Sequence, residues 1–367
     1  MKTQRFRSLA TANGPFVSVY IDDSRDSAEG ENELETRWRD VRRELEDKCA
    51  DERIIGDVAH AILDGRPAVG QGGRAVVASR DGVLIDEQLP NPPQQTVVRV
   101  SEYPYIVPLL DVARHDVYVF AAVDHAGADI TLHQGDVVRS ETVDGGGYPV
   151  HKPVTSGWNG YGDYQRTTEE AVRMNVRATA DRLTELVDKA GAEVVFVCGE
   201  TRSRNDVVSA LPHRVARKVS SWHAGAHGHR IGEEEARDHV ADEFELRRRA
   251  ETAEVVDRFL GERGRGSGLA VEGLAAVCAA LREGCVETLI VGDLGDGTVV
   301  TGESRTTVAP DADALSALGE PALRVVRADE ALPFAAIATD ASLIRIGPAL
   351  SPADGTAALL RYVPTDM

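Results

Sequence analysis

The stretch GLAAVCAALREGCVETLIVGD, residues 273–293, combines two patterns that define secondary structure. Its first half is rich in alanine and places apolar residues at helical spacing, and Gly284 stands where such a helix would end. Its second half is a short apolar run, typical of a buried strand. We therefore predict a helix over residues 269–284, LAVEGLAAVCAALREG, followed directly by a strand, as in an α/β domain.

The sequence on either side of this stretch predicts a separate carboxyl-terminal domain. GERGRGSG, residues 261–268, alternates glycine with charged residues and serine, which is typical of a flexible linker. ALRVVRA and SLIRIGP, residues 322–328 and 342–348, have the composition of short strands. We expect an α/β domain over residues 266–367.

Two further α/β units are predicted upstream. In the first, over residues 1–110, the strand PFVSVYI is followed by a helix with Leu34, Trp38, Val41 and Leu45 on one face. In the second, over residues 111–265, a hairpin starts at VYVFAAVD and a strand, AEVVFVCGE, follows a long helix. The fold class is α/β, with three domains whose mixed sheets are flanked by helices and with breaks near residues 110 and 265.

The composition is that of a globular protein. Of 367 residues 42% are hydrophobic and 28% charged, and no apolar run approaches the roughly 20 residues of a transmembrane helix. The amino terminus, MKTQRFRSLATANGPF, lacks the apolar segment of a signal peptide. The four cysteines contain no CxxC pair, which predicts reduced core residues in the cytoplasm: Cys49, Cys198, Cys278 and Cys285.

The charge is distributed unevenly. The net charge of −19 argues against a uniformly basic surface for nucleic acid, and we expect neither DNA nor a membrane as a partner. Residues 201–230 nevertheless hold six Lys and Arg against one acid, Asp206. Such cations can be a solvated face without a partner, or they can contact RNA phosphates locally. Residues 266–367 hold six basic and fourteen acidic residues, which favours a protein partner there.

The segment DGGGYPVHKPVTSGWNGYGDYQ, residues 144–165, is the most informative one for function. It predicts a long loop, because it has many glycines and no apolar periodicity, and loops of this length are usually functional or disordered. Aromatic and cationic side chains on such a backbone suit single-stranded or irregular RNA, whose bases stack on rings. The simpler interpretation is a surface loop with incidental aromatics.

Catalytic and metal-binding motifs are weak. The sequence contains no GxSxG, GxxxxGK[ST] or HExxH motif, and the glycines at 145–147 do not open a helix after a strand. His223, His227 and His229 have spacings that can converge on zinc, but no carboxylate or cysteine ligand lies among them. We expect no metal and no cofactor, and instead a polar or RNA-facing segment in which Trp222 offers a stacking face.

Four features together resemble the archaeo-eukaryotic peptide chain release factor and Pelota superfamily, including its bacterial members. They are the hairpin followed by a glycine-rich loop and a helix, the charged helix VVDRFLGER, the segment AALREGCVETLIV and the closing segment GTAALLRY. The resemblance extends from about residue 111 onwards. It implies a three-domain mimic of tRNA that enters the ribosomal A site alongside a translational GTPase.

Release factors of this superfamily carry Gly-Gly-Gln at the tip of the middle-domain loop, where it helps to hydrolyse peptidyl-tRNA. Alignment of the following helix at residues 174–177 places the tip at Gly157-Trp158-Asn159-Gly160, which has no glutamine. Gln165 lies closer to the helix. Among bacterial relatives the pattern is most similar to the Balon-like ribosome hibernation factors, which implies A-site occupation and no enzymatic activity.

The resemblance also implies partners and contact residues. We expect 16S and 23S rRNA at the A site, with domain 1–110 towards the decoding centre and domain 111–265 towards the peptidyl transferase centre. The acidic third domain would face elongation factor Tu or another translational GTPase. The expected rRNA contacts are His151, Lys152, Gly157, Trp158, Asn159, Gly160, Tyr161, Tyr164, Gln165, Arg166, Arg202, Arg204, Arg214, Arg217, Lys218, Trp222 and His223.

Two alternatives stay open. One is a peptidyl-tRNA hydrolase that uses Gln165 or a histidine of the loop. The other is a Pelota-like factor that rescues stalled ribosomes.

Overall fold

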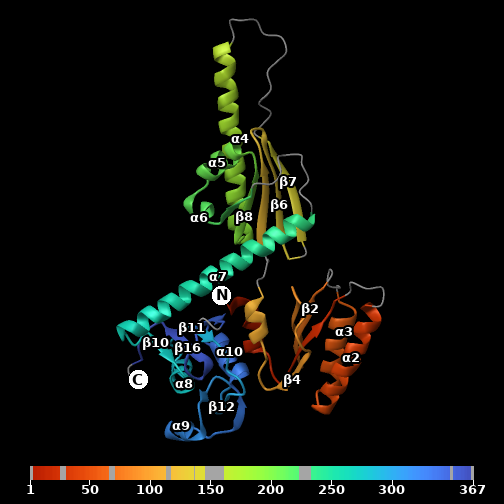
Figure 1. Ribbon diagram of the computed structural model, residues 1–367, viewed down its shortest axis with the longest axis vertical. Helices are drawn as coiled ribbons and strands as arrows, with labels where there is room; N and C mark the ends of the chain where they lie inside the picture. The colour runs from red at the N-terminus through yellow and green to blue at the C-terminus, as the bar shows by residue number, and fades with distance from the viewer. Residues whose placement is uncertain are drawn as a thin grey trace. The chain divides into compact units, whose positions relative to one another are not determined.

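The computed structural model describes residues 3–24, 30–65, 71–112, 117–135, 137–144, 161–222, 233–347 and 350–364 (Figure 1). The chain forms two compact units. Met1–Val112 and Arg249–Met367 together make one, here called the terminal unit, and Ala113–Arg248 makes the other, the middle unit. The first division falls close to the break predicted near residue 110. The second lies between residues 248 and 249, upstream of the break predicted near 265.

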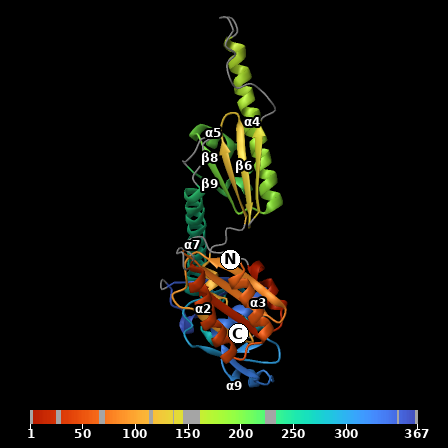
Figure 2. The same cartoon turned by 90° about the vertical axis from the view of Figure 1, so that its right-hand side faces the viewer.

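The amino-terminal segment of the terminal unit forms an antiparallel sheet in the order β3-β2-β1-β4. Its elements are η1 (Thr3–Phe6), α1 (Arg7–Thr11), β1 (Phe16–Asp22), α2 (Gly30–Asp47), α3 (Glu52–Leu63), β2 (Gly73–Ser79), β3 (Gly82–Leu89), β4 (Val97–Ser101) and η2 (Val107–Asp111). The apolar face predicted for α2 is confirmed, because Leu34, Trp38, Val41 and Leu45 are all buried. Together α2 and α3 cover one face of this sheet (Figure 2).

The carboxyl-terminal segment forms two sheets, in the orders β10-β16-β11-β15 and β13-β12-β14. Its elements are β10 (Ala270–Glu272), α8 (Leu274–Arg282), β11 (Val286–Val291), β12 (Thr298–Thr301), β13 (Val308–Ala309), α9 (Ala312–Ala317), β14 (Arg324–Arg327), α10 (Ala328–Ala338), β15 (Ser342–Arg345), η4 (Ala353–Gly355) and β16 (Thr356–Leu360). The helix, glycine and strand of the opening stretch are confirmed, and Gly284 has a φ of +64°. The helix is shorter than predicted, because residues 270–272 pair with β16 as a strand.

One continuous core joins these two segments. Phe16, Tyr20 and Val77 of the amino-terminal sheet lie in the same cluster as Leu332 and Phe334 of α10. The Tyr103 hydroxyl donates to the Arg305 carbonyl at 3.1 Å, and its ring meets Phe334 edge-on at 5.2 Å between centroids. The first and last parts of the chain therefore share one core, in contrast to the two separate domains that the sequence predicts.

The middle unit has a five-stranded mixed sheet in the order β7-β6-β5-β8-β9. Its elements are β5 (Val117–Val123), β6 (Gly127–Gln134), β7 (Val137–Asp144), α4 (Tyr161–Ala190), β8 (Val194–Gly199), α5 (Thr201–Ala210), α6 (His213–Ala216), β9 (Val219–Ser221) and the start of α7 (Glu233–Arg265). The helices α4 and α5 cover one face, and Val240 and Phe244 of α7 pack on the other. The mixed α/β class predicted from the sequence is confirmed.

Helix α7 replaces most of the predicted linker. It continues to Arg265, so residues 261–265 are helical, and Gly266 and Gly268, with φ of +62° and +77°, follow its end. The continuation has a physical cause, because Phe259 is fully buried beside Ile290 and Leu359 of the carboxyl-terminal sheet. This packing holds the second half of α7 in place as a helix.

The hydropathy of the helices and the burial of the cysteines can be compared with the sequence predictions. No helix in the described ranges is both long enough and apolar enough to cross a bilayer. Three cysteines are buried as predicted, and burial raises the pKa of Cys278 to about 12. Cys49 is exposed instead, because it lies in the turn after α2 with a φ of +57°.

We expect Phe259→Ala to lower the opening free energy of the carboxyl-terminal sheet by about 3–5 kcal/mol, since it leaves a cavity under α7. Leu260→Ala is the matched control, because Leu260 is 39% exposed and its truncation should cost less than about 1 kcal/mol. Native-state hydrogen exchange at the β16 amides measures both effects. Equal small effects would show that α7 does not support this sheet.

Candidate functional site

One end of the middle unit carries five of the residues that the sequence singles out, Tyr161, Tyr164, Gln165, Arg166 and Arg202. β5 and β8 run parallel, so their carboxyl ends meet at the same edge of the sheet. Asp144, the last residue of β7, pairs with Gly127 at this edge, and α5 begins there after β8. We call this the loop end, because residues 145–160 start from it.

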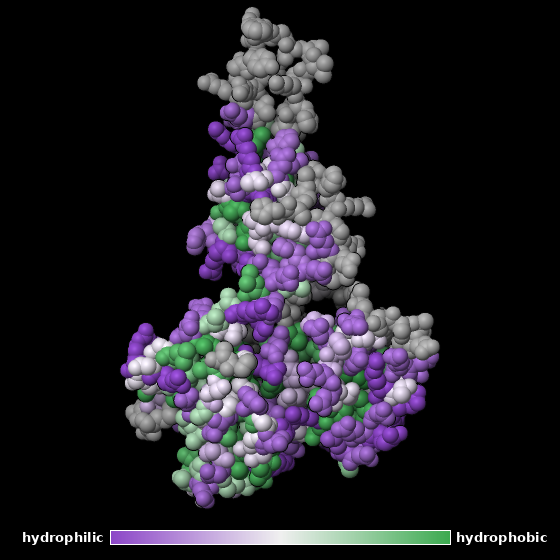
Figure 3. All heavy atoms as spheres, in the orientation of Figure 1, coloured by the Kyte–Doolittle hydropathy of each residue, from purple (hydrophilic) through white to green (hydrophobic). Residues whose placement is uncertain are grey.

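Helix α4 extends beyond the sheet at the loop end. The Asn175 side-chain amide donates to the carbonyl of His125, in the turn after β5, at 3.0 Å and so marks where the helix passes the edge. Residues Tyr161–Met174 precede this contact and span about 21 Å at 1.5 Å per residue. Figure 1 shows this part of α4 projecting past the strands of its own sheet. Mostly hydrophilic residues cover its described part in Figure 3.

The predicted loop is shorter in the structure than in the sequence analysis. His151, Lys152, Gly157, Trp158, Asn159 and Gly160 lie outside the described residues, as do His223, His227 and His229. Tyr161, Tyr164, Gln165 and Arg166 belong to the first two turns of α4, which corrects their assignment to the loop. The physical reason is composition, because residues 163–173 contain Gln, Arg, Glu and Ala, which favour helix, and neither glycine nor proline.

Two of the predicted RNA-contacting residues are parts of the core. Arg204 is 3% exposed and donates to the Trp222 carbonyl at 2.5 Å. Trp222 is 9% exposed and stacks on His239 of α7, with 4.5 Å between the ring centroids. A buried guanidinium needs hydrogen-bond partners within the protein, and Trp222 has no free face here. The prediction that Arg204 and Trp222 face RNA is therefore corrected.

Three other predicted cations lie at the opposite end of the sheet. β9 runs parallel to β8, so residues just before β9 are near the amino end of β8. Lys218 donates to the Ala192 carbonyl at 2.7 Å. Arg214 contacts Asp188 near the end of α4 at 2.7 Å, and this guanidinium lowers the pKa of the Asp188 carboxyl. The basic stretch is thus divided, with Arg214, Arg217 and Lys218 away from the loop end.

Exposed guanidiniums remain at the loop end. The Arg202 side chain is 92% exposed, and its nearest carboxylate, Asp206, is 3.9 Å away, a separation that contributes little stability. Arg173 and Arg177 are exposed on α4, and neither has an ion-pair partner in the described part of the chain. These two arginines were missed in the sequence. The sequence feature that could have identified them is their spacing of four residues, which places both on one side of a helix. The same side of α4 carries Asp188, which contacts Arg214 of α6.

The opposite face of the sheet is closed by aromatic packing. Tyr118 stacks on His133 at 4.4 Å between centroids, and Phe120 stacks on Phe196 at 4.9 Å. Burial lowers the pKa of His133, so this imidazole is neutral at pH 7 and adds no cation. This face holds α7, and the cations described above are on the face of α4 and α5.

The loop end can bind phosphates. Its exposed guanidiniums are fixed charges that pair with phosphate oxygens. Among the described residues, no group of three or more His, Cys, Asp and Glu could hold a metal ion. The chemistry that these positions offer is electrostatic recognition of an anionic polymer.

The chain is similar to known proteins in sequence. A model of the bacterial archaeo-eukaryotic release factor family 2 matches residues 117–265, which are the described start of the middle unit through the end of α7. The chain is 58% identical over 367 residues to uncharacterized protein Rv2629 of Mycobacterium tuberculosis (strain ATCC 25618 / H37Rv), covering 100% of this chain and 98% of that protein. Uncharacterized protein MT2704 of strain CDC 1551 / Oshkosh gives the same values.

The chain is also similar to solved structures, at low sequence identity and low TM-score. The archaeal translation termination factor aRF1 matches with a TM-score of 0.25 and 17% identity, covering 97% of this chain and 96% of that one. Pelota of Archaeoglobus fulgidus matches with a TM-score of 0.36 and 12% identity, covering 98% and 90%. Ribosome-bound archaeal Pelota matches with a TM-score of 0.42 and 14% identity, covering 98% and 93%.

The family match covers the unit that carries the loop end, and the identity to the mycobacterial relatives extends over the whole chain. The resemblance to the bacterial branch of the release factor and Pelota superfamily is therefore confirmed. Residues 117–265 of the chain match the bacterial archaeo-eukaryotic release factor family 2, within the bacterial branch of the release factor and Pelota superfamily.

Proposed function

We propose that the protein occupies the ribosomal A site and blocks translation during stress or dormancy, as Balon-like hibernation factors do, without releasing peptide. The observation that carries the proposal is the loop end. There α4 projects past the sheet, the sequence Gly157-Trp158-Asn159-Gly160 directly precedes this helix in the chain, and exposed arginines flank the base of the helix. The match of residues 117–265 to a release factor family supports a role at the ribosome.

The charges at the loop end suit rRNA. Arg173 and Arg177, which have no ion-pair partner among the described residues, and Arg202, whose side chain is 92% exposed, provide guanidiniums in a chain whose net charge is −19. Phosphate binding depends on local cations, so an acidic chain can still bind RNA through one surface. Lys152 and Arg166, closer to the tip in sequence, would extend this contact, and Trp158 would stack on exposed bases.

The sequence of the tip argues against release chemistry. Release factors of this superfamily use Gly-Gly-Gln, whereas this chain has Gly157-Trp158-Asn159-Gly160. The indole of Trp158 would fill the space in which a hydrolytic water must lie. Gln165 is in the first two turns of α4, where its backbone lacks the freedom of a Gly-Gly pair. We therefore propose that the protein is not an enzyme.

The proposed partners are 16S and 23S rRNA together with a translational GTPase such as elongation factor Tu. The residues after 265 carry a net charge of −8, which repels phosphate and suits a protein surface. The proposed location is the cytoplasm, where translating ribosomes are found.

Arg173→Glu should weaken co-sedimentation with ribosomes at least about fivefold at 0.1 M salt and should reduce the salt dependence of binding. Lys189→Glu is the matched control, because Lys189 is exposed on the same helix, about 24 Å away at the opposite end. Equal losses for both variants would mean that overall charge, and not the loop end, determines binding.

Trp158→Ala should weaken ribosome binding by about 1–3 kcal/mol, the contribution of one stacked base. Trp158→Phe keeps an aromatic face and should recover most of that loss. Filter binding to vacant ribosomes measures both. If Trp158→Ala binds like the native protein, the tip does not stack on rRNA.

Purified protein should release no peptide from peptidyl-tRNA on ribosomes, because the tip has no Gly-Gly-Gln. A release assay with a known release factor as positive control tests this expectation. Peptide release that is abolished by Gln165→Ala would replace the hibernation proposal with the hydrolase alternative.

Polysome profiles of stationary-phase cells separate hibernation from rescue. With a hibernation factor, loss of the protein should reduce the inactive monosome fraction. With a Pelota-like rescue factor, loss should instead accumulate stalled ribosomes on messages that lack a stop codon.

A further inference from the structure

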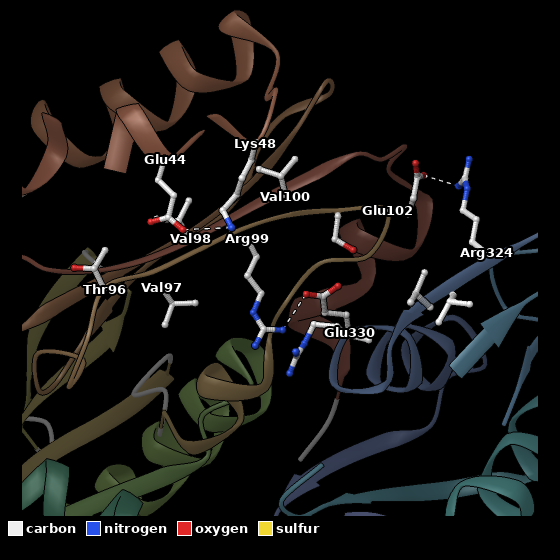
Figure 4. Close-up of a pocket in the computed structure, with 14 residues that line it drawn as sticks. Glu44, Lys48, Thr96, Val97, Val98, Arg99, Val100, Glu102, Arg324 and Glu330 are labelled. Carbon is white, nitrogen blue, oxygen red and sulfur yellow. Dashed lines mark hydrogen bonds and ion pairs between the residues drawn. The ribbon is translucent and has the colours of Figure 1, made fainter. Parts of the chain in front are cut away.

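The terminal unit has a groove whose two walls are strand edges. The groove has a volume of about 860 Å³ and is lined by residues Thr96–Glu102 along β4 and by Arg324–Arg327 of β14. Side chains of a strand alternate between two faces, so a wall made by the face of a sheet shows every second residue. Here consecutive residues of both strands line the space, which means that the edges of β4 and β14 face it (Figure 4).

Both strands are last in their sheets. Within the described residues, β4 pairs with β1 alone and β14 with β12 alone. The Ala328 amide donates to the Gly297 carbonyl, and Thr298 is opposite Arg327. Arg327 is the N-cap of α10, so its carbonyl accepts a hydrogen bond within that helix. In an antiparallel ladder the pattern alternates, so the main-chain N–H and C=O of Val325 and the N–H of Arg327 point away from β12. These groups can pair with a further strand.

The charged side chains around the groove are paired with one another. Each of its seven charged residues has an opposite charge within 4.0 Å, and the pairs are Lys48–Glu44, Arg99–Glu330, Arg324–Glu102 and Arg327–Asp329. Figure 4 shows Arg99 pointing towards Glu330, and Glu102 facing Arg324. The groove therefore offers no free charge to a ligand.

Valines line much of the rest of the groove, beside Thr96 and Ser101. Val97, Val98, Val100 and Val326 line it, together with Val325, which is 70% exposed. A largely exposed valine on an unpaired edge strand is unusual, because native edges are normally protected by charge, proline or a covering element. Apolar side chains and free main-chain groups occur together here, which is the surface that an extended peptide recognises.

We propose that this groove binds an extended, uncharged segment of a protein partner, which adds as a strand to β14 and lies along β4. Its backbone would pair with the outward groups of Val325 and Arg327, and its β-branched side chains would contact the valines. Seven residues, the length of the β4 wall, span about 23 Å in a strand. This inference does not depend on the proposed function, since no part of the loop end takes part.

The probe is the uncharged, blocked peptide Ac-Gln-Thr-Val-Thr-Val-Thr-Gln-NH2, labelled with a fluorophore, against the full-length protein. We expect saturable binding by fluorescence anisotropy below about 1 mM. Hydrogen exchange should slow at the Val325 and Arg327 amides. The control peptide Ac-Gln-Thr-Pro-Thr-Pro-Thr-Gln-NH2 cannot donate from its proline positions and should not bind. No saturation with the first peptide, or protection confined to other strands, overturns the proposal.

Val325→Pro removes the outward N–H, and proline is tolerated on an edge strand. We expect it to weaken peptide binding at least about tenfold, whereas Val325→Thr keeps the N–H and the shape and should stay within about threefold. Thermal unfolding of each variant checks the fold. Equal binding by both variants overturns the proposal. A dimer that Val325→Pro dissociates would assign the groove to a second copy of the chain, and this also overturns it.

Discussion

The guanidinium of Arg99 links the amino-terminal sheet to α10 of the carboxyl-terminal segment, and the arrangement of the terminal unit depends on this contact. It contacts Asp329 at 3.1 Å and Glu330 at 2.9 Å, and it lies 3.6 Å from the centre of the Tyr105 ring. Two adjacent carboxylates in a largely buried site are unfavourable unless cations neutralise them, and Arg327 supplies the second cation. Because Arg99 is on β4 and the carboxylates are on α10, this charge network fixes the edge of the amino-terminal sheet against the carboxyl-terminal segment. The groove between β4 and β14 exists as a result.

Local sequence predicts a helix or strand correctly where a single local pattern determines its structure. The spacing from Leu34 to Leu45 predicts α2, and Gly284 predicts the end of α8, because periodicity and a positive φ are local properties. The predicted linker at residues 261–268 is wrong for a non-local reason. Gly261 and Gly264 together disfavour helix by about 2 kcal/mol. Burial of Phe259, with ion pairs such as Arg258–Glu287, outweighs this cost, and none of these contacts is visible before the fold is known.

The candidate site was predicted only in part, because strand direction divides the basic stretch. Residues 201–222 leave β8 at its carboxyl end and return to enter β9 at the opposite end, so Arg202 and Arg217 are separated although they are close in sequence. Arg173 and Arg177 join Arg202 because α4 runs antiparallel to β8, a relation that appears only with the topology. Arg204 is not distinguishable from its exposed neighbours by residue type. Its burial follows from the position of Trp222, whose carbonyl it binds.

The helical start of α4 at Tyr161 lowers the ordering cost of the proposed binding to the ribosome. Ordering one residue of backbone costs about 1–2 kcal/mol, which a flexible loop must lose on binding. Tyr161 to Gln165 were predicted to be loop, and α4 orders them before any partner is met. The favourable free energy of binding through the arginines at the base of α4 is then not offset by the cost of ordering these residues. A helix that is ordered in advance keeps more of its contact free energy as affinity, which is the property that the proposed occupation of the A site would need.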